Sequence, residues 1–169
     1  GGVSRYDATN WMTYTTEDGL VNDAILGVFQ DREGFLWFGT QGGVSRLEDG
    51  FTTFTTEDGL SSNKIWSIYE DTDNALWFGT GGIYGLGAGV MRLGGDVWTS
   101  WGVEQGLGNT QVYATLQDRD GVFWFATQGG VFCYDGKTFT RFGEEHGLVE
   151  DLVFSIIQDR NGTFWFGTE

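Results

Sequence analysis

Two short motifs recur along the chain at matching intervals, and this repetition strongly limits the folds available to it. The tryptophan of W-F-[GA]-T stands at positions 37, 77, 124 and 165, and the glycine of [DQH]-G-L at 19, 59, 106 and 147. Both motifs are spaced by 40, 47 and 41 residues. A period of this size indicates a repeat architecture. The longer second interval indicates an insertion, which is mostly the segment "IYGLGA" at 83–88.

Each repeat predicts four short strands. The first strand falls at 24–31, 64–71, 111–118 and 152–159, the second carries W-F-[GA]-T, the third is of the type at 43–47, and the fourth is of the type at 51–54. Alternating apolar residues rich in β-branched and aromatic types favour strands. The first strand is apolar on both faces, so it should be covered on both sides. Its midpoint is small in every copy, which suits the centre of a radial arrangement.

The turn between the first two strands reads D-R-E-G, D-T-D-N, D-R-D-G and D-R-N-G. Glycine and asparagine tolerate a left-handed backbone, so the pattern predicts a type I turn closed by a left-handed residue. The sequence D-x-D-G also resembles part of a calcium loop, but such a loop needs more oxygen ligands than these residues supply. We therefore favour the turn and expect no metal site.

Composition excludes several classes of partner. The 169 residues carry a net charge of −15, which argues against nucleic acid and anionic membrane surfaces. One cysteine rules out an internal disulfide and any multi-cysteine metal site. No apolar run approaches the roughly 18 residues that a membrane-spanning helix needs, so we expect no membrane insertion. The chain does not begin with Met, which suggests a processed product, an excised domain or an incomplete record.

Four antiparallel strands in about 40 residues describe the blade of a β-propeller. The shared W-F-G-T, G-G-V-x-R, F-x-x-F and D-G-L-x-x-N motifs resemble the repeat of the two-component regulator propeller family. This resemblance implies the extracytoplasmic sensor region of a bacterial signalling protein, in a family where many members respond to glycans. It therefore implies a periplasmic or extracellular location. Cys133 in the arginine position of the last repeat and the insertion depart from the family pattern.

We predict one all-β propeller domain over residues 1–169, with blades at 24–56, 64–102 and 111–143 and a further blade split between 1–16 and 152–169. The last strand should join the initial "GGVSRYD" as "LWFGTQ" joins "GGVSRL" within the chain. We expect the two ends to meet in a four-bladed ring, because an unpaired edge invites aggregation. Two alternatives stay open: two chains that exchange halves in an eight-bladed homodimeric ring, or a longer chain with further blades.

Ligand-binding residues are expected on the face that carries the variable loops, since loops on a rigid scaffold hold most binding residues. The candidates are Glu17, Asp18, Glu57, Asp58, Tyr84, Trp101, Glu104, Gln105, Glu145 and His146. The alternative interpretation of the acidic residues is solvation and turn formation, and that of Tyr84 is a loop anchor. The repeated tryptophans are expected in the core. Arg5, Arg46 and Arg92 share one position in the third strand, where we expect pairing with carboxylates between blades.

The favoured function is a non-catalytic propeller that senses a glycan or another small ligand, without a cofactor. The first alternative is an assembly module with no small ligand. The second is an enzyme similar to the virginiamycin B lyase group, whose propellers use histidine with magnesium. His146 is the only histidine and no G-x-S-x-G motif is present, so the enzyme is the least favoured of the three.

Overall fold

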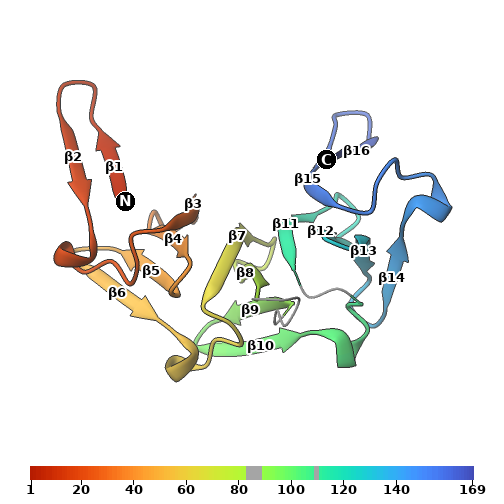
Figure 1. The fold of residues 1–169 in the computed structure, drawn as a ribbon, viewed down its shortest axis with the longest axis horizontal. Helices are drawn as coiled ribbons and strands as arrows, with labels where there is room; N and C mark the ends of the chain where they lie inside the picture. Colours follow the sequence, from red (N-terminus) through yellow and green to blue (C-terminus); the bar gives the residue numbers. More distant parts are fainter. Residues whose placement is uncertain (83–88, 109–110) are drawn as a thin grey trace.

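Sixteen β-strands form nearly all the regular structure of this computed structural model, which describes residues 1–82, 89–108 and 111–169 (Figure 1). They form three four-stranded antiparallel sheets and two hairpins. The first blade consists of β3 (Ile25–Gln30), β4 (Leu36–Thr40), β5 (Val44–Leu47) and β6 (Phe51–Phe54). The second consists of β7 (Lys64–Glu70), β8 (Leu76–Gly81), β9 (Val90–Gly94) and β10 (Val97–Trp101). The third consists of β11 (Val112–Gln117), β12 (Phe123–Thr127), β13 (Gly130–Tyr134) and β14 (Phe139–Phe142).

The remaining strands form a hairpin at each end of the chain. The N-terminal hairpin pairs β1 (Val3–Tyr6) with β2 (Trp11–Tyr14), and the C-terminal hairpin pairs β15 (Val153–Gln158) with β16 (Phe164–Thr168). By repeat position, the N-terminal hairpin contains a third and a fourth strand, and the C-terminal hairpin a first and a second strand. The predicted all-β class and four-stranded antiparallel blades are confirmed.

The first strand of each repeat lies against the first strand of the next repeat, at the inner side of the arc. Each of these strands has a β-bulge at the same place, as between Ile25 and Gly27 in β3. A Cβ at Gly27 would lie 3.2 Å from the carbonyl oxygen of Trp66 in the next blade. The small midpoint residues therefore allow neighbouring blades to approach closely.

The turn between the first and second strands has the predicted left-handed residue in every repeat. Gly34, Asn74, Gly121 and Gly162 have φ values of 95°, 62°, 84° and 87°. The leading aspartate holds this turn: in the first blade Asp31 Oδ1 accepts a hydrogen bond from the Phe35 N–H at 2.9 Å, and Oδ2 accepts one from Trp37 Nε1 at 2.6 Å. The other three repeats form the same tryptophan–aspartate bond. The aspartates are occupied in this way, and the described residues contain no group of three metal-ligating side chains.

The hydrophobic core lies between the blades and is mainly aromatic. Trp77, which is 3% exposed, stacks on Trp101 at 5.2 Å between ring centroids and contacts Phe123 of the third blade at 4.1 Å. Trp37 is likewise 3% exposed, as predicted for the repeated tryptophans. Trp165 is the exception at 61% exposure, because among the described residues no third and fourth strands pair with the C-terminal hairpin.

The two terminal hairpins lie at opposite ends of an open arc (Figure 1). Each is a separate two-stranded sheet, so the predicted pairing of the last strand with the first within one chain is not what the structure shows. The number of blades that closes a ring depends on the angle between neighbouring sheets. Here the three blades and two hairpins describe only an arc. Closure by a second chain or by further blades stays a prediction.

Among the described residues, no helix combines the length and the apolar character needed to span a membrane.

Candidate functional site

Within the described residues, the predicted loop face contains four one-turn 3-10 helices, one before the first strand of each repeat. They are η1 (Thr16–Asp18), η2 (Thr56–Asp58), η4 (Val103–Gln105) and η5 (Glu144–His146). Asp18 and Asp58 each accept a hydrogen bond through Oδ2 from the N–H of the threonine that precedes the helix, at 2.9 Å. These two candidate carboxylates therefore complete capping boxes, which gives them a structural role.

Gln105 and His146 occupy the same position in the later repeats, and each accepts the corresponding backbone hydrogen bond. Gln105 Oε1 accepts from the Gly102 N–H at 2.8 Å, and His146 Nδ1 accepts from the Gly143 N–H at 3.2 Å. The His146 ring also packs edge-on against Phe142 at 5.7 Å between centroids. The residue before G-L can thus be aspartate, glutamine or histidine, because each of these side chains can accept this backbone hydrogen bond.

The remaining candidates do not form one cluster. Glu17, Glu57 and Glu104 are exposed, and Glu145 forms an ion pair with Arg141. A hydrogen bond from its own backbone N–H, followed by the charge of Arg141, holds the pKa of the Glu145 carboxyl below its usual value. Trp101 is part of the core through its stacking on Trp77, and Tyr84 lies outside the described residues. Whether the loop face binds a ligand stays a prediction.

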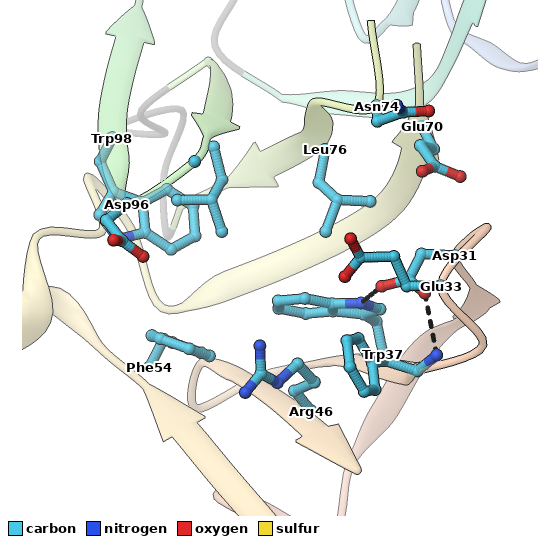
Figure 2. A pocket seen from close by; sticks show the side chains of 13 residues that line it. Asp31, Glu33, Trp37, Arg46, Phe54, Glu70, Asn74, Leu76, Asp96 and Trp98 are labelled. Carbon is cyan, nitrogen blue, oxygen red and sulfur yellow. Dashed lines mark hydrogen bonds between the residues drawn. The ribbon is translucent and has the colours of Figure 1, made fainter. Parts of the chain in front are cut away.

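A cleft of about 420 Å³ opens between the first and second blades, on the opposite face, beside the turns that carry Asp31 and Asp96 (Figure 2). Its size lies within the range of small-molecule sites. Its lining combines aromatic, aliphatic and charged side chains. The residues are Asp31, Glu33, Phe35, Trp37, Arg46, Phe54, Glu70, Asn74, Leu76, Leu93, Gly95, Asp96 and Trp98.

Arg46 is the single basic side chain among these lining residues. Its guanidinium carbon lies 5.0 Å from the centre of the Phe35 ring and 5.7 Å from that of Trp37, and Figure 2 shows it between Phe54 and Trp37. Its Nη2 lies 3.5 Å from Glu48 Oε2, while its Nε is buried without a hydrogen-bond partner. Buried polar groups are normally paired, so this Nε is an unsatisfied donor on a side chain that lines the cleft.

The corresponding arginine of the second blade is paired differently. Arg92 Nε lies 3.5 Å from Oδ2 of Asp71, the turn aspartate of its own blade. The expected pairing of these arginines with carboxylates is therefore found, but Arg46 and Arg92 pair within their own blade. The reason is that the third strand pairs directly with the second, so the arginine lies over the tryptophan and the turn aspartate of its own sheet. Arg141, which is the arginine of the last repeat, pairs with Asp151 ahead of the C-terminal hairpin at 2.6 Å, as expected between blades.

Four carboxylates line the same cleft as Arg46 and give the cleft a negative balance. Asp31 is engaged with its turn, and Glu70 accepts a hydrogen bond from the Arg32 N–H at 3.0 Å. Glu33 and Asp96 remain exposed at the rim. The cleft can therefore offer one strong donor and two free acceptors between aromatic walls.

The cleft forms here because of a difference in side-chain size between repeats. Trp77 packs against Phe123 at 4.1 Å and Trp124 against Phe164 at 4.4 Å, whereas the matching residue opposite Trp37 is Leu76. The smaller leucine leaves room beside the Trp37 ring. The contrast between L-W-F and F-W-F in successive repeats is a sequence signal for this space. The cleft was not predicted from the sequence, because the ligand-binding candidates were expected on the face that carries the variable loops.

Comparison with known proteins matches the observed architecture. A family model described as "Two component regulator propeller" matches residues 19–42, 59–82, 106–129 and 147–169, more than half of the chain. No curated protein matches the chain significantly. Among solved structures, the extracellular domain of a putative hybrid two component system from B. thetaiotaomicron is similar with a TM-score of 0.81 and 26% identity, over 95% of this chain and 23% of that one.

Two further structures share the fold. A second extracellular domain of a putative hybrid two component system from B. thetaiotaomicron has a TM-score of 0.79 at 18% identity, over 99% of this chain and 23% of that one. Virginiamycin B lyase from Staphylococcus aureus has a TM-score of 0.65 at 14% identity, over 85% of this chain and 48% of that one. The chain thus spans about a quarter of the extracellular domains that it matches. With four matched repeats and the blade architecture of these relatives, the chain belongs to the two component regulator propeller family.

Proposed function

We propose that this chain is a non-catalytic, ligand-sensing propeller that binds a neutral, hydroxyl-rich ligand such as a glycan in the cleft around Arg46. The observation that carries the proposal is the buried Arg46 Nε, which has no hydrogen-bond partner and borders a cleft of about 420 Å³. If the guanidinium turns toward the cleft, a ligand oxygen that accepts from this Nε would remove the cost of an unpaired buried donor.

The charges around Arg46 favour a neutral ligand over an anionic one. The cleft contains four carboxylates and one guanidinium, on a chain with a net charge of −15, so an anion would be repelled. A hydroxyl group can accept from Arg46 and also donate to Glu33 or Asp96. The apolar faces of Phe54 and Trp98 can cover the less polar side of such a ligand.

The proposed setting is outside the cytoplasm. It is supported by the similarity to extracellular domains of two component systems and by the family to which the chain belongs. At 14% identity, the similarity to the lyase concerns the fold alone. The side chain of His146 already accepts a hydrogen bond from the backbone N–H of Gly143. We therefore propose binding rather than catalysis.

The test is a glycan array followed by calorimetry on any neutral oligosaccharide that binds. Two variants address the cleft: Arg46→Gln, which removes the guanidinium, and Asp96→Asn, which changes an exposed rim residue. Glu57→Gln is the matched control, because Glu57 is exposed like Asp96 but lies on the loop face. A lost hydrogen bond to a charged group is worth about 1.5–3 kcal/mol, so Arg46→Gln should weaken binding by at least about tenfold.

The outcomes separate the hypotheses. Weaker binding in the two cleft variants supports the cleft as the binding site, provided that their circular dichroism is unchanged and that Glu57→Gln binds like the wild type. Weaker binding in Glu57→Gln alone would contradict the cleft and indicate that the ligand binds on the loop face. An array without any bound glycan, obtained with folded protein, contradicts glycan sensing and favours the assembly module.

A further inference from the structure

A second cavity lies between the third blade and the C-terminal hairpin. It has a volume of about 300 Å³ and is mainly apolar. Its lining residues are Trp124, Val131, Phe142, His146, Gly147, Leu148, Phe164 and Phe166. The same position in the core between the second and third blades is filled by aromatic side chains, which shows what kind of group the cavity lacks.

The filling groups come from the third and fourth strands of the following blade. Between the second and third blades they are Phe132, Tyr134 and Phe139. Tyr134 and Phe139 stack at 4.5 Å with an interplanar angle of 22°, and they contact Trp101 at 5.9 Å and Phe125 at 6.1 Å respectively. The C-terminal hairpin has no third and fourth strand beside it among the described residues, so its core lacks this aromatic pair.

The N-terminal hairpin carries the missing pair in a preformed arrangement. Tyr6 and Trp11 occupy the positions of Tyr134 and Phe139, and they stack at 4.7 Å with an interplanar angle of 26°. Both rings are exposed, at 56% and 71%. An exposed stacked aromatic pair is unusual on a soluble surface and marks a contact site.

We propose that the N-terminal hairpin of a second copy of this chain pairs with β16 and inserts Tyr6 and Trp11 into this cavity. The occupant is a second copy because the two hairpins are complementary halves of one blade and lie at opposite ends of the same arc (Figure 1). The register follows from the internal pairs Trp37–Arg46, Trp77–Arg92 and Trp124–Cys133. It places Trp165 opposite Arg5 of the second copy, and Phe166 opposite Ser4.

Charge and polar groups fit the same register. Trp165 Nε1 donates to Asp159 Oδ2 at 3.0 Å, so Arg5 of the second copy meets Asp159 as Arg92 meets Asp71. The composite blade then packs against the first blade of the second copy. At that contact, the backbone N–H of Arg160 would donate a hydrogen bond to Oε1 of Gln30 of the second copy. The equivalent bond within the chain runs from the Arg119 N–H to Gln158 Oε1 at 3.3 Å.

The contact also covers the largest exposed apolar residues at the two ends of the arc. Trp165 and Ile157 at the C-terminal hairpin are 61% and 60% exposed, and Val28 at the first blade is 62% exposed. Their counterparts in the second blade are Trp77, Tyr69 and Ile68, which belong to or pack against the inter-blade cores. Exchange at both ends gives a two-fold symmetric, closed ring of eight blades, which is within the usual range for propellers.

The test combines solution mass with a cross-link that reports the register. Sedimentation equilibrium at physiological salt should give about twice the 18.7 kDa of the chain. The double variant Tyr6→Ala/Trp11→Ala should raise the dimer dissociation constant by at least about tenfold, as expected for buried aromatic anchors. The matched control Val97→Ala/Val103→Ala changes two apolar residues that are 66% and 58% exposed but lie outside the contact, and it should leave the mass unchanged.

The cross-linking variant is Ser4→Cys/Phe166→Cys in a Cys133→Ala background. On oxidation it should form a covalent dimer that runs at twice the chain mass on a non-reducing gel, and the two single-cysteine variants should not form it. An 18.7 kDa wild-type protein up to high micromolar concentration would overturn the proposal. A cross-link within one chain would also overturn it and would indicate a four-bladed ring instead.

Discussion

Trp77 provides the sharpest test of how the blades are held together. Its side chain is 3% exposed, contacts the rings of Trp101 and Phe123, and donates a hydrogen bond to Asp71 Oδ2 at 2.7 Å. A buried tryptophan removes up to about 250 Å² from water, worth about 6 kcal/mol at 25 cal/mol per Å². Residual structure in the unfolded chain lowers this value by about 10–40%.

We therefore expect Trp77→Ala to lower the free energy of unfolding by about 4–5 kcal/mol, near the top of the usual range for such truncations. Trp77→Phe keeps most of the ring packing and loses only the indole N–H, so it should cost about 1–3 kcal/mol. Arg92, at 3.5 Å from Asp71 Oδ2, limits the cost of leaving that oxygen without the indole.

The assay is urea unfolding followed by circular dichroism, and Trp165→Ala is the internal control. Trp165 forms the same bond to its aspartate but is 61% exposed, so its truncation should cost less than about 2 kcal/mol. Both substitutions are compared in the Tyr6→Ala/Trp11→Ala background, at a protein concentration below its dimer dissociation constant, so that contact with a second copy does not bury Trp165. Equal losses for Trp77→Ala and Trp165→Ala would refute the argument that burial between blades, and not the repeated hydrogen bond, supplies the stability.

Two further predictions concern backbone crowding and acid stability. A Cβ at Gly79 would lie 2.3 Å from Ser67 Oγ, so Gly79→Ala should destabilise the protein by about 1–3 kcal/mol in urea unfolding, whereas Gly50→Ala, with no atom within 4 Å, should change it little. Hydrogen bonds from the Thr9 hydroxyl and two backbone N–H groups lower the pKa of Asp7 from 3.8 to about 2. Because this pKa is depressed in the folded state, the stability that Asp7 gives to the N-terminal hairpin is complete above about pH 4 and is lost as the pH falls toward 2. An NMR titration of the Asp7 carboxyl that gives a midpoint near 3.8 would contradict this.

Much of the fold could be predicted from the residues because its signals are local and are repeated four times. The strand of Lys64–Glu70 was expected at 64–71, and the left-handed Asn74 follows from the steric tolerance of asparagine at a glycine position. The core position of Trp77 follows from the W-F-[GA]-T motif of its own strand. Each of these inferences depends on one blade alone.

The candidate site could not be predicted in the same way. Asp18 and His146 looked like binding residues, but their side chains accept hydrogen bonds from backbone groups three residues earlier in the chain, and only the folded loop reveals this. The cleft around Arg46 depends on Leu76 of the next blade, a residue 30 positions away that is smaller than its counterparts Phe123 and Phe164.

The sequence by itself therefore determined the repeat, the four-stranded blade, the turn chemistry and the aromatic character of the core, because strand alternation and turn preference act within a few residues. Only the tertiary structure decided that Arg46 borders an open cleft and that the two terminal hairpins lie apart with complementary faces exposed. Both features depend on the angle and the spacing between successive blades, which arise from the packing of side chains that are distant in the sequence.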